Sequence, residues 1–403
     1  MFIVLKILKN YETLVYSAFS IFLSVIQTIV ITKYFVQKDY GSYGFYISLS
    51  QVVLILTNWG YTSWGVNEIG IKSKLNLTVI LNKIIVSKFI IGGISLIAML
   101  TYIILISGKL DFVIISAFLF YYLSIVFSLD ILYISLNKVD NMVKISLVSK
   151  FLYTILFCFT LFFIKVPHTW LFMLFAVQSM ANSLFLYWKQ NDFKLKLNFI
   201  CAKTEGVILE SGPNFFLVLC SFLFASGPVI CAGHFLSKDS FSVVYASTAI
   251  VKLVQASYQP LINKILPKLN MGLAVEVDVK LALLFAIVAT ITLYLSAPLI
   301  VKIIFNNNYT GVLPAIRLFT LSIVPGIMST IIIGQWAVYT NNLSSMYVIV
   351  AIVAAVNFII YILFLKVLSW QFFIWSMLLS EIFLFCLVFI MKKWKQRILS
   401  YGN

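Results

Sequence analysis

The chain has 403 residues, of which 62% are hydrophobic and only 10% are charged, and its formal net charge is +16. A soluble domain carries about 25% charged residues, and no soluble fold hides so large an apolar share in its interior, so the composition excludes a soluble globular protein. The apolar runs are about 20 residues long, which suits helices that cross a hydrocarbon core of about 30 Å. The alternating pattern of a membrane β-barrel is absent.

Twelve membrane-spanning helices are predicted, which makes the fold class an all-α polytopic membrane protein. Lys6 and Lys9 precede the first apolar run as in a signal peptide, but the run continues to about Ile31 without a small-residue cleavage site, so we expect a retained first span. The predicted spans are 12–32, 43–64, 83–106, 112–136, 143–164, 169–188, 208–233, 241–262, 281–304, 313–338, 345–365 and 370–391.

The basic residues in the connections and at the very ends of these spans are distributed unequally. Eighteen lysines and arginines fall on one side of the membrane and seven on the other. The positive-inside rule therefore predicts that the richer side, with both chain termini, is cytoplasmic. Topology accounts for the net positive charge, and a nucleic-acid partner is not expected.

The longest predicted connection divides the chain into six spans and six spans. We expect an N-terminal six-helix bundle, a cytoplasmic linker and a C-terminal six-helix bundle, at 1–190, 191–207 and 208–403. A repeat supports this division: FVQKDYGSYGFY at 35–46 joins the first two spans, and FLSKDSFSVVYA at 235–246 joins the seventh and eighth. Parallel repeats of this kind place a substrate path between two halves. We interpret both stretches as outer turns that close a first hairpin.

Two predicted spans carry polar stripes at helical spacing. In the first span the stripe contains Ser20, Ser24 and Gln27, and such a stripe either joins neighbouring helices or lines a wet cavity. In the eighth span the stripe is Thr248, Lys252, Gln255, Gln259 and Asn263. Lys252 lies near the middle of its span, where a cation costs about 2.5–3.5 kcal/mol, so we expect it to face a water-filled cavity, the alternative being burial beside a carboxylate.

Other ionisable residues inside spans leave alternatives open. Lys88 and Lys150 lie near the cytoplasmic ends of their spans, where snorkelling also explains a lysine, and Asp130 could pair with either. Arg317 begins the tenth span and could lie at the outer interface. Glu381 is in the middle of the twelfth span, where a protonated structural carboxyl and a functional one are equally compatible with the sequence.

The usual signatures of catalysis are absent from the sequence. Five scattered cysteines and two distant histidines predict no metal site, and no phosphate-binding GxxxxGK[ST] loop, HExxH or GxSxG motif occurs. The predicted outer loops are short, about ten residues or fewer, which is typical of compact hairpins and leaves little material for an enzyme site. The chain is therefore predicted to be a transport path and not an enzyme.

Several stretches resemble the polysaccharide-transporter family, the Wzx-type O-antigen flippases of the MOP superfamily. They are KDYGSYGFYISLSQVVLILTNWGYTSWGVNEIG at 38–70, DILYISLNKVDNMVKISLVSK at 130–150, ESGPNFFLVLCSFLFASGPVICAGHFLSKDS at 210–240 and FNNNYTGVLPAIRLFTLSIVPGIMST at 305–330. By this match Asp130, Tyr133 and Lys150 fall on family positions, although Tyr133 stands where Trp is usual and Asn137 where Gly is usual.

The resemblance implies two MATE-like bundles in a V around a central cavity. It also implies a multi-pass protein of the bacterial inner membrane that flips undecaprenyl-diphosphate-linked O-antigen repeat units, or those of a related polysaccharide, to the periplasmic leaflet by alternating access. No cofactor is expected beyond coupling to H⁺ or Na⁺, with Asp130 and Glu381 as candidate ion sites. Expected partners are the lipid-linked oligosaccharide, membrane lipids, a polysaccharide polymerase and a chain-length regulator.

Candidate residues of the substrate path follow from the stripes and the intramembrane charges together. They are Ser20, Ser24, Gln27, Lys88, Asp130, Lys150, Thr248, Lys252, Gln255, Gln259 and Arg317. Two other functions stay open from the sequence: a MATE-like multidrug or cation antiporter, and a membrane polysaccharide polymerase or glycosyltransferase, which the short outer loops oppose.

Overall fold

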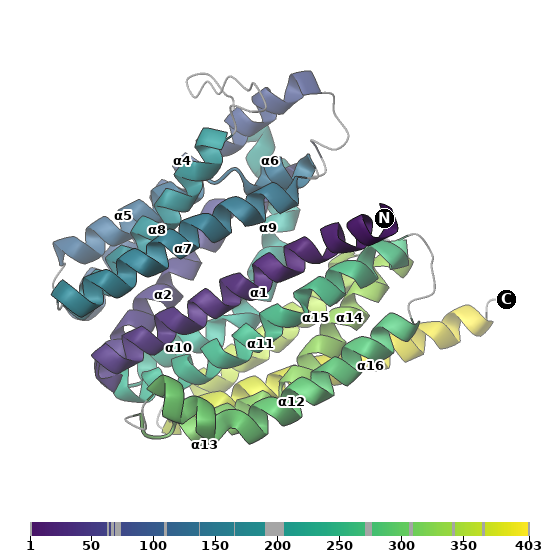
Figure 1. Cartoon of the computed structure of the whole chain (residues 1–403). Helices are drawn as coiled ribbons and strands as arrows, with labels where there is room; N and C mark the ends of the chain where they lie inside the picture. Colours follow the sequence, from purple (N-terminus) through teal and green to yellow (C-terminus); the bar gives the residue numbers. More distant parts are fainter. Residues whose placement is uncertain are drawn as a thin grey trace. The chain divides into compact units, whose positions relative to one another are not determined.

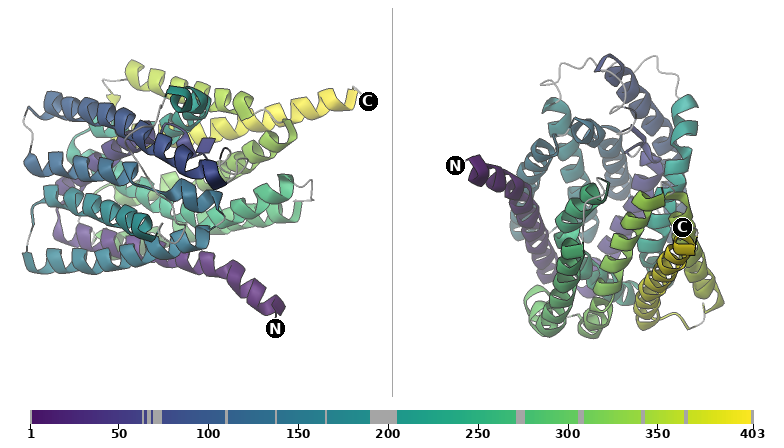
Figure 2. Two further views of the ribbon diagram at one scale, coloured as in Figure 1. Left: turned by 90° about the horizontal axis from the view of Figure 1, so that it is seen from above. Right: turned by 90° about the vertical axis from the view of Figure 1, so that its right-hand side faces the viewer.

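The structure is a computed structural model, and its described residues form helices and no strand (Figures 1 and 2). The backbone is described except at residues 1, 63, 66–67, 69–73, 109–110, 137, 165, 190–204, 271–275, 306–308, 341–342, 365–366 and 402–403. Side chains are also left undescribed at 2–15, 17–18, 74–76, 107, 139, 205, 256–270, 276–278, 334–340, 343–347 and 392–401. The helices described are α1 (Phe2–Tyr34), α2 (Gln37–Asn58), α4 (Lys74–Ser107), α5 (Phe112–Val126), α6 (Asp130–Ser135), α7 (Val139–Ile164), α8 (His168–Lys189), α9 (Glu205–Ala225), α10 (Gly227–Phe235), α11 (Lys238–Asn270), α12 (Glu276–Phe305), α13 (Val312–Thr320), α14 (Ile323–Thr340), α15 (Leu343–Leu363) and α16 (Trp370–Tyr401).

The helices confirm a multi-pass membrane protein. Within the described residues, eight helical segments are long and apolar enough to cross a membrane. The remaining four predicted spans coincide with α1, α2, α11 and α15, whose described parts fall short of that length or hydropathy. The number of twelve spans, and the cytoplasmic placement of the termini, therefore remain predictions.

Three predicted spans are each divided into two helices. The fourth consists of α5 and α6, the seventh of α9 and α10, and the tenth of α13 and α14. Pro228 lies at the start of α10 and Pro325 near the start of α14, where a missing backbone N–H costs no helical hydrogen bond. Pro213 and Pro298, by contrast, lie inside the continuous helices α9 and α12.

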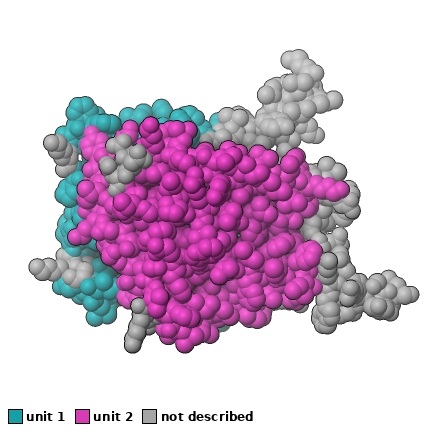
Figure 3. Space-filling view, turned by 90° about the horizontal axis from the view of Figure 1, so that it is seen from below, with its two compact units in different colours: residues 1–30, 45–219 teal, residues 31–44, 220–403 magenta. Residues whose placement is uncertain are grey.

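The chain forms two compact units (Figure 3). Unit 1 comprises residues 1–30 and 45–219, and unit 2 comprises residues 31–44 and 220–403. In unit 1, α5 packs along α8, which also contacts α7, and α4 packs against α5. In unit 2, α14 packs against α16 and α12, while α11 packs against α13. The predicted linker at 191–207 lies almost entirely outside the described residues, and the predicted bundle boundaries remain a prediction.

The two repeated KD stretches are helical where turns were predicted. Lys38-Asp39 lies in the first turn of α2 and Lys238-Asp239 in the first turn of α11, because an acidic residue there is favoured by the helix dipole. Two residues separate α1 from α2, and two separate α10 from α11, so both turns are shorter than expected.

The repeated stretches also contact each other within unit 2. Gln37 Nε2 donates a hydrogen bond of 3.0 Å to the Asp239 carbonyl. A side chain at Gly41 would collide with the Lys238 backbone, and the Tyr40 and Tyr245 rings lie 5.4 Å apart. Glycine at position 41 therefore permits the close approach of the two helix ends.

Candidate functional site

Lys150 of α7 reaches the predicted polar stripe of α1 within unit 1. Its Nζ donates hydrogen bonds to Ser24 Oγ at 2.5 Å and to Ser20 Oγ at 3.1 Å. All three side chains are half-buried, and among the described residues no carboxylate forms an ion pair with Lys150. An ammonium group has three donors, so one remains for a ligand.

Polar contacts also join α1 and α7 on either side of Lys150 along the helix axis. Gln27 Nε2 donates to Thr154 Oγ1 at 2.8 Å, and Thr154 Oγ1 donates to the Lys150 carbonyl at 2.7 Å. Lys144 Nζ lies 5.4 Å from the centre of the Tyr16 ring. Because the contacts advance together along both helices, α1 and α7 run parallel, as the predicted topology of the first and fifth spans requires.

Lys88 of α4 has a different environment, at the break between α5 and α6. Its side chain is only 2% exposed, and Nζ donates to the carbonyl of Ile125 at 3.1 Å and to that of Ser128 at 3.5 Å. Asp130, at the start of α6, accepts a 2.7 Å hydrogen bond from Ser128 Oγ and interacts electrostatically with Lys88. The ammonium thus donates to two carbonyl groups at the end of α5, of which that of Ile125 also accepts from the Ser128 N–H, and the helix dipole favours a cation there.

Unit 2 brings a lysine and a carboxylate together. Lys252 of α11 is exposed, and it interacts electrostatically with Glu381 of α16. A methyl group placed on Gly326 of α14 would lie 3.4 Å from Glu381 Oε2 and 3.6 Å from Gln255 Nε2. Helices α11 and α16 therefore bring an amide and a carboxylate close to one glycine of α14, and Lys252 of α11 lies within electrostatic range of that carboxylate.

The other predicted residues lie in separate settings. Thr248 is buried, and its hydroxyl donates to the carbonyls of Val244 and Tyr245 in its own helix. The Arg317 guanidinium lies 5.4 Å from the centre of the Tyr294 ring, and its buried Nε has no hydrogen-bond partner among the described residues. The Gln259 side chain lies outside the described residues.

Sequence reasoning missed several residues that shape these sites. Gly326 follows Pro325 and carried no signal beyond being small, while Thr154 lies one turn after Lys150 on the same face. The sequence did contain a signal for Asn357, because a side-chain amide within an apolar span is costly unless the protein supplies a hydrogen-bond partner. It pairs with Ser380 across α15 and α16.

The comparisons with known proteins concern the fold. No protein-family model matches the sequence, and no curated protein matches it. Among solved structures, an inward-facing multidrug resistance MATE family transporter of the MOP superfamily matches with 11% identity and a TM-score of 0.70, covering 98% of this chain and 99% of that one. The lipid II flippase MurJ in an inward closed conformation matches with 16% identity and a TM-score of 0.72, covering 94% and 87%. An outward-facing MATE structure matches with 12% identity and a TM-score of 0.61, covering 97% and 95%. The chain therefore shares its fold with these transporter and flippase structures.

Proposed function

We propose that this chain is a flippase that moves undecaprenyl-diphosphate-linked repeat units of O-antigen, or of a related polysaccharide, from the cytoplasmic to the periplasmic leaflet of a bacterial inner membrane. The observation that carries the proposal is Lys150, an intramembrane cation held by two hydroxyl groups and free of any ion pair within the described residues. A diphosphate supplies the negative charge that such a site lacks.

The balance of intramembrane charge supports an anionic cargo. More than three residues from either end of the predicted spans there are four basic residues, Lys88, Lys150, Lys252 and Arg317, against two acidic residues, Asp130 and Glu381. Each acid lies near a lysine, Asp130 near Lys88 and Glu381 near Lys252. A site built for cationic drugs needs unpaired carboxylates, so this arrangement favours phosphate over a cation.

The residues take different parts in this proposal. Lys150 and Lys252 each offer a binding point for a phosphate group, and Gln27 and Gln255 can exchange hydrogen bonds with glycan hydroxyls. Glu381 is the candidate site of ion coupling: a proton or Na⁺ on its carboxylate weakens its attraction for Lys252 and frees that lysine for phosphate. Lys88 and Asp130 hold the break between α5 and α6 and stand outside the transport step.

Complementation tests the proposal. The chain is expressed in bacteria that lack their own O-antigen flippase, in a panel of strains with different repeat units, and surface polysaccharide is read on a gel. We expect restored polysaccharide in at least one strain, near-complete loss with Lys252→Ala at normal protein level, and partial activity with Lys252→Arg, which keeps the charge.

Other outcomes identify the rival functions. Lengthened or modified lipid-linked units would show a polymerase or glycosyltransferase. Drug resistance without any restored polysaccharide would show an antiporter of the MATE kind. Full activity of Lys252→Ala would remove this lysine from the transport path.

A further inference from the structure

One side of α12 in unit 2 is an exposed apolar stripe. Within unit 2 the helix packs against α11, α13 and α14, and its buried residues recur at helical spacing. The opposite side exposes more than half of each of five side chains, Leu284, Val288, Ile291, Leu295 and Leu299. Because residues 279–305 are long and apolar enough to cross a membrane, this stripe suits contact with lipid chains.

Arg317 of α13 lies beside this stripe. Its guanidinium carbon, Cζ, is 5.4 Å from the centre of the Tyr294 ring, and Tyr294 is 42% exposed and adjoins Leu295 of the stripe. On α13 itself Arg317 shares a side with Pro314 and Leu321, three residues before it and four after, and both of these are exposed. The positive charge therefore lies where α12 and α13 meet at the surface of the unit.

The guanidinium has no hydrogen-bond acceptor in the described part of the chain. Its Nε is buried without a partner, and no described carboxylate forms an ion pair with Arg317. The contact with the Tyr294 ring covers one face of the planar group and leaves the five N–H donors at its edge unused. Unpaired donors of a cation within an apolar span are costly, so an acceptor from outside the chain is favoured there.

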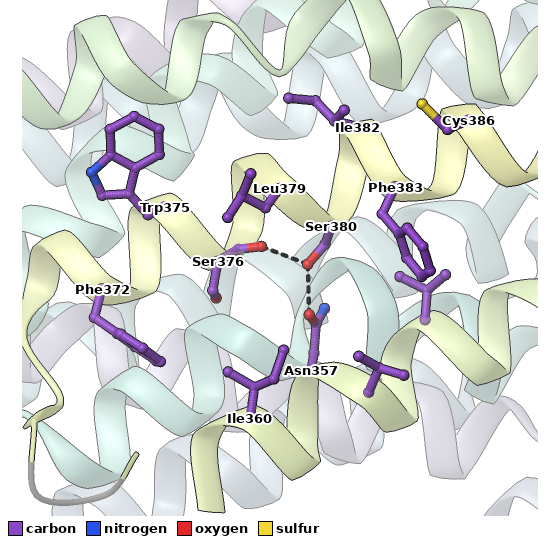
Figure 4. A pocket seen from close by; sticks show the side chains of 12 residues that line it. Asn357, Ile360, Phe372, Trp375, Ser376, Leu379, Ser380, Ile382, Phe383 and Cys386 are labelled. Carbon is purple, nitrogen blue, oxygen red and sulfur yellow. Dashed lines mark hydrogen bonds between the residues drawn. The ribbon is translucent and has the colours of Figure 1, made fainter. Parts of the chain in front are cut away.

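A second exposed apolar surface of unit 2 lacks such a charge. The pocket between α15 and α16 has a volume of about 690 Å³ and is lined by twelve residues, none of them Lys, Arg, Asp or Glu (Figure 4). Its Ser380 Oγ lies 2.6 Å from Asn357 Oδ1 and 2.5 Å from the Ser376 carbonyl oxygen, so this hydroxyl is satisfied within the protein. This pocket is therefore a reference for contact with lipid that involves no charge.

The depth of Arg317 suits a lipid headgroup. The span that contains it begins at Val312, so Arg317 lies about 7.5 Å along the helix at 1.5 Å per residue. Helical side chains tilt toward the N-terminus of their helix, which brings the guanidinium back toward the membrane surface where α13 begins. Lys302, three residues before the end of α12, is exposed near the same surface. Lipid phosphates lie in the polar layer just outside the hydrocarbon core, within reach of such cations.

We propose that Arg317 binds the phosphate group of a lipid whose chains lie along the apolar stripe of α12. The edge of a guanidinium offers parallel N–H donors that match two phosphate oxygens, and the Tyr294 ring holds the plane of the group. Two kinds of lipid carry this phosphate chemistry, a membrane phospholipid and a polyprenyl-linked cargo. The site does not depend on the proposed function, because either lipid fits it.

Native mass spectrometry of the full chain, delipidated in detergent, tests the site. The four probes are phosphatidylglycerol and diacylglycerol, which differ by the phosphate headgroup, and polyprenyl phosphate and polyprenol, which differ in the same way. We expect at least one phosphate lipid to bind at least tenfold more tightly than its phosphate-free counterpart. The phosphate lipid that shows this difference identifies the source of the ligand.

Matched variants assign the binding to Arg317. Arg317→Gln removes the charge and should weaken binding of that lipid at least fivefold, while Arg317→Lys keeps the charge without the planar fork and should weaken it about two- to fivefold. Tyr294→Leu removes the ring beneath the guanidinium and should weaken binding about two- to threefold. Lys280→Gln removes an exposed charge at the other end of α12 and should change binding less than twofold.

Photolabelling in phospholipid nanodiscs locates the bound lipid. The probe is the phosphate lipid selected by mass spectrometry, with a diazirine near the start of its chain. We expect adducts on peptides that contain Ile291 and Leu295 at least fivefold above those on the α15 and α16 pocket, and Arg317→Gln should remove this difference.

Several outcomes would overturn the proposal. They are equal binding of the phosphate-free lipids, an equal loss of binding with Lys280→Gln, and equal labelling of the stripe and the pocket. If Arg317→Gln does not fold, unchanged binding by both Arg317→Lys and Tyr294→Leu would overturn it as well.

The lipid site and the proposed transport fail independently. Arg317-dependent binding of phosphatidylglycerol together with failed complementation would leave the lipid site standing and make the proposed transport wrong. Successful complementation without any Arg317-dependent binding would leave the transport standing and make the lipid site wrong.

Discussion

Lys88 and Lys150 both lie in unit 1, inside helices that cross the membrane, and their surroundings differ. Lys88 is almost completely buried and donates to the backbone carbonyls of Ile125 and Ser128. Lys150 is half-buried and donates to two serine hydroxyls on another helix. Both carry one positive charge, and Lys88 also has the Asp130 carboxylate within electrostatic range, so the partner groups distinguish the two lysines.

The difference teaches which intramembrane lysine is available to a ligand. Backbone carbonyls at a helix end are fixed acceptors. Without the ammonium the Ser128 carbonyl loses the hydrogen bond from Lys88, and the Ile125 carbonyl keeps the one from the Ser128 N–H. Serine hydroxyls rotate, and they can donate to their own helix when a ligand takes the lysine, as Ser24 Oγ already does to the Ser20 carbonyl. We therefore expect Lys88 to stabilise the fold and Lys150 to be the lysine that is available to an anion.

Replacing Lys88 by methionine should have the largest effect on stability. The change removes the ammonium from two carbonyls and from the neighbouring Asp130 charge, and we expect a loss of about 3–5 kcal/mol in the free energy of unfolding. Thermal and denaturant unfolding of the purified protein in detergent measure it. Lys83→Met is the control, because it removes one positive charge from the same helix without removing Lys88. Unchanged stability of Lys88→Met would break the comparison, because Lys88 would then be free for another role.

Replacing Lys150 by methionine should separate transport from stability. We expect at least a tenfold fall in surface polysaccharide, with the free energy of unfolding within about 1 kcal/mol of the parent protein, since the hydroxyls can turn to their own helices. Lys150→Arg keeps the charge and should retain part of the activity. If Lys150→Met unfolds as readily as Lys88→Met, the two lysines are both structural.

The sequence predicted the class of fold and the faces of the helices better than the contacts between them. Composition and apolar runs identified an all-helical membrane protein, which the structure confirms. Helical spacing placed Ser20, Ser24 and Gln27 on one face of the first span. Which helix covers that face depends on how all the helices pack, so the pairing of Ser20 and Ser24 with Lys150 did not follow from the spacing.

The helix break after α5 and the pairing of charged residues far apart in the chain could not be predicted from a single sequence either. The break after α5 has no proline, and it is stabilised by Lys88 from another helix, so nothing local announced it. Glu381 has no basic neighbour in the sequence, yet Lys252 lies within electrostatic range of it in unit 2. Both findings depend on long-range packing, which residue type and periodicity do not encode.

Replacing Asp130 by asparagine tests how much the negative charge beside Lys88 contributes to stability. The amide oxygen can still accept from Ser128, and only the charge near Lys88 is lost, so we expect a smaller loss of about 1–2 kcal/mol in the free energy of unfolding. Transport by the folded fraction should respond to proton and sodium gradients in the same way as transport by the parent chain, measured in membrane vesicles. A stable variant that has lost this dependence would instead make Asp130 an ion-coupling site.

Single serine changes should have the smallest effects and rank by the length of the hydrogen bond. Ser24 Oγ lies 2.5 Å from Lys150 Nζ and Ser20 Oγ lies 3.1 Å from it, so Ser24 holds the ammonium more strongly. We expect Ser24→Ala to lower transport about three- to tenfold and Ser20→Ala about twofold or less, since a hydrogen bond to a charged group is worth about 1.5–3 kcal/mol at most. Surface polysaccharide at matched protein level measures both. If both variants are fully active while Lys150→Met is inactive, the lysine binds its anion without help from the hydroxyls, and charge alone defines the site. If Ser20→Ala has the stronger effect, the lysine turns toward Ser20 during transport.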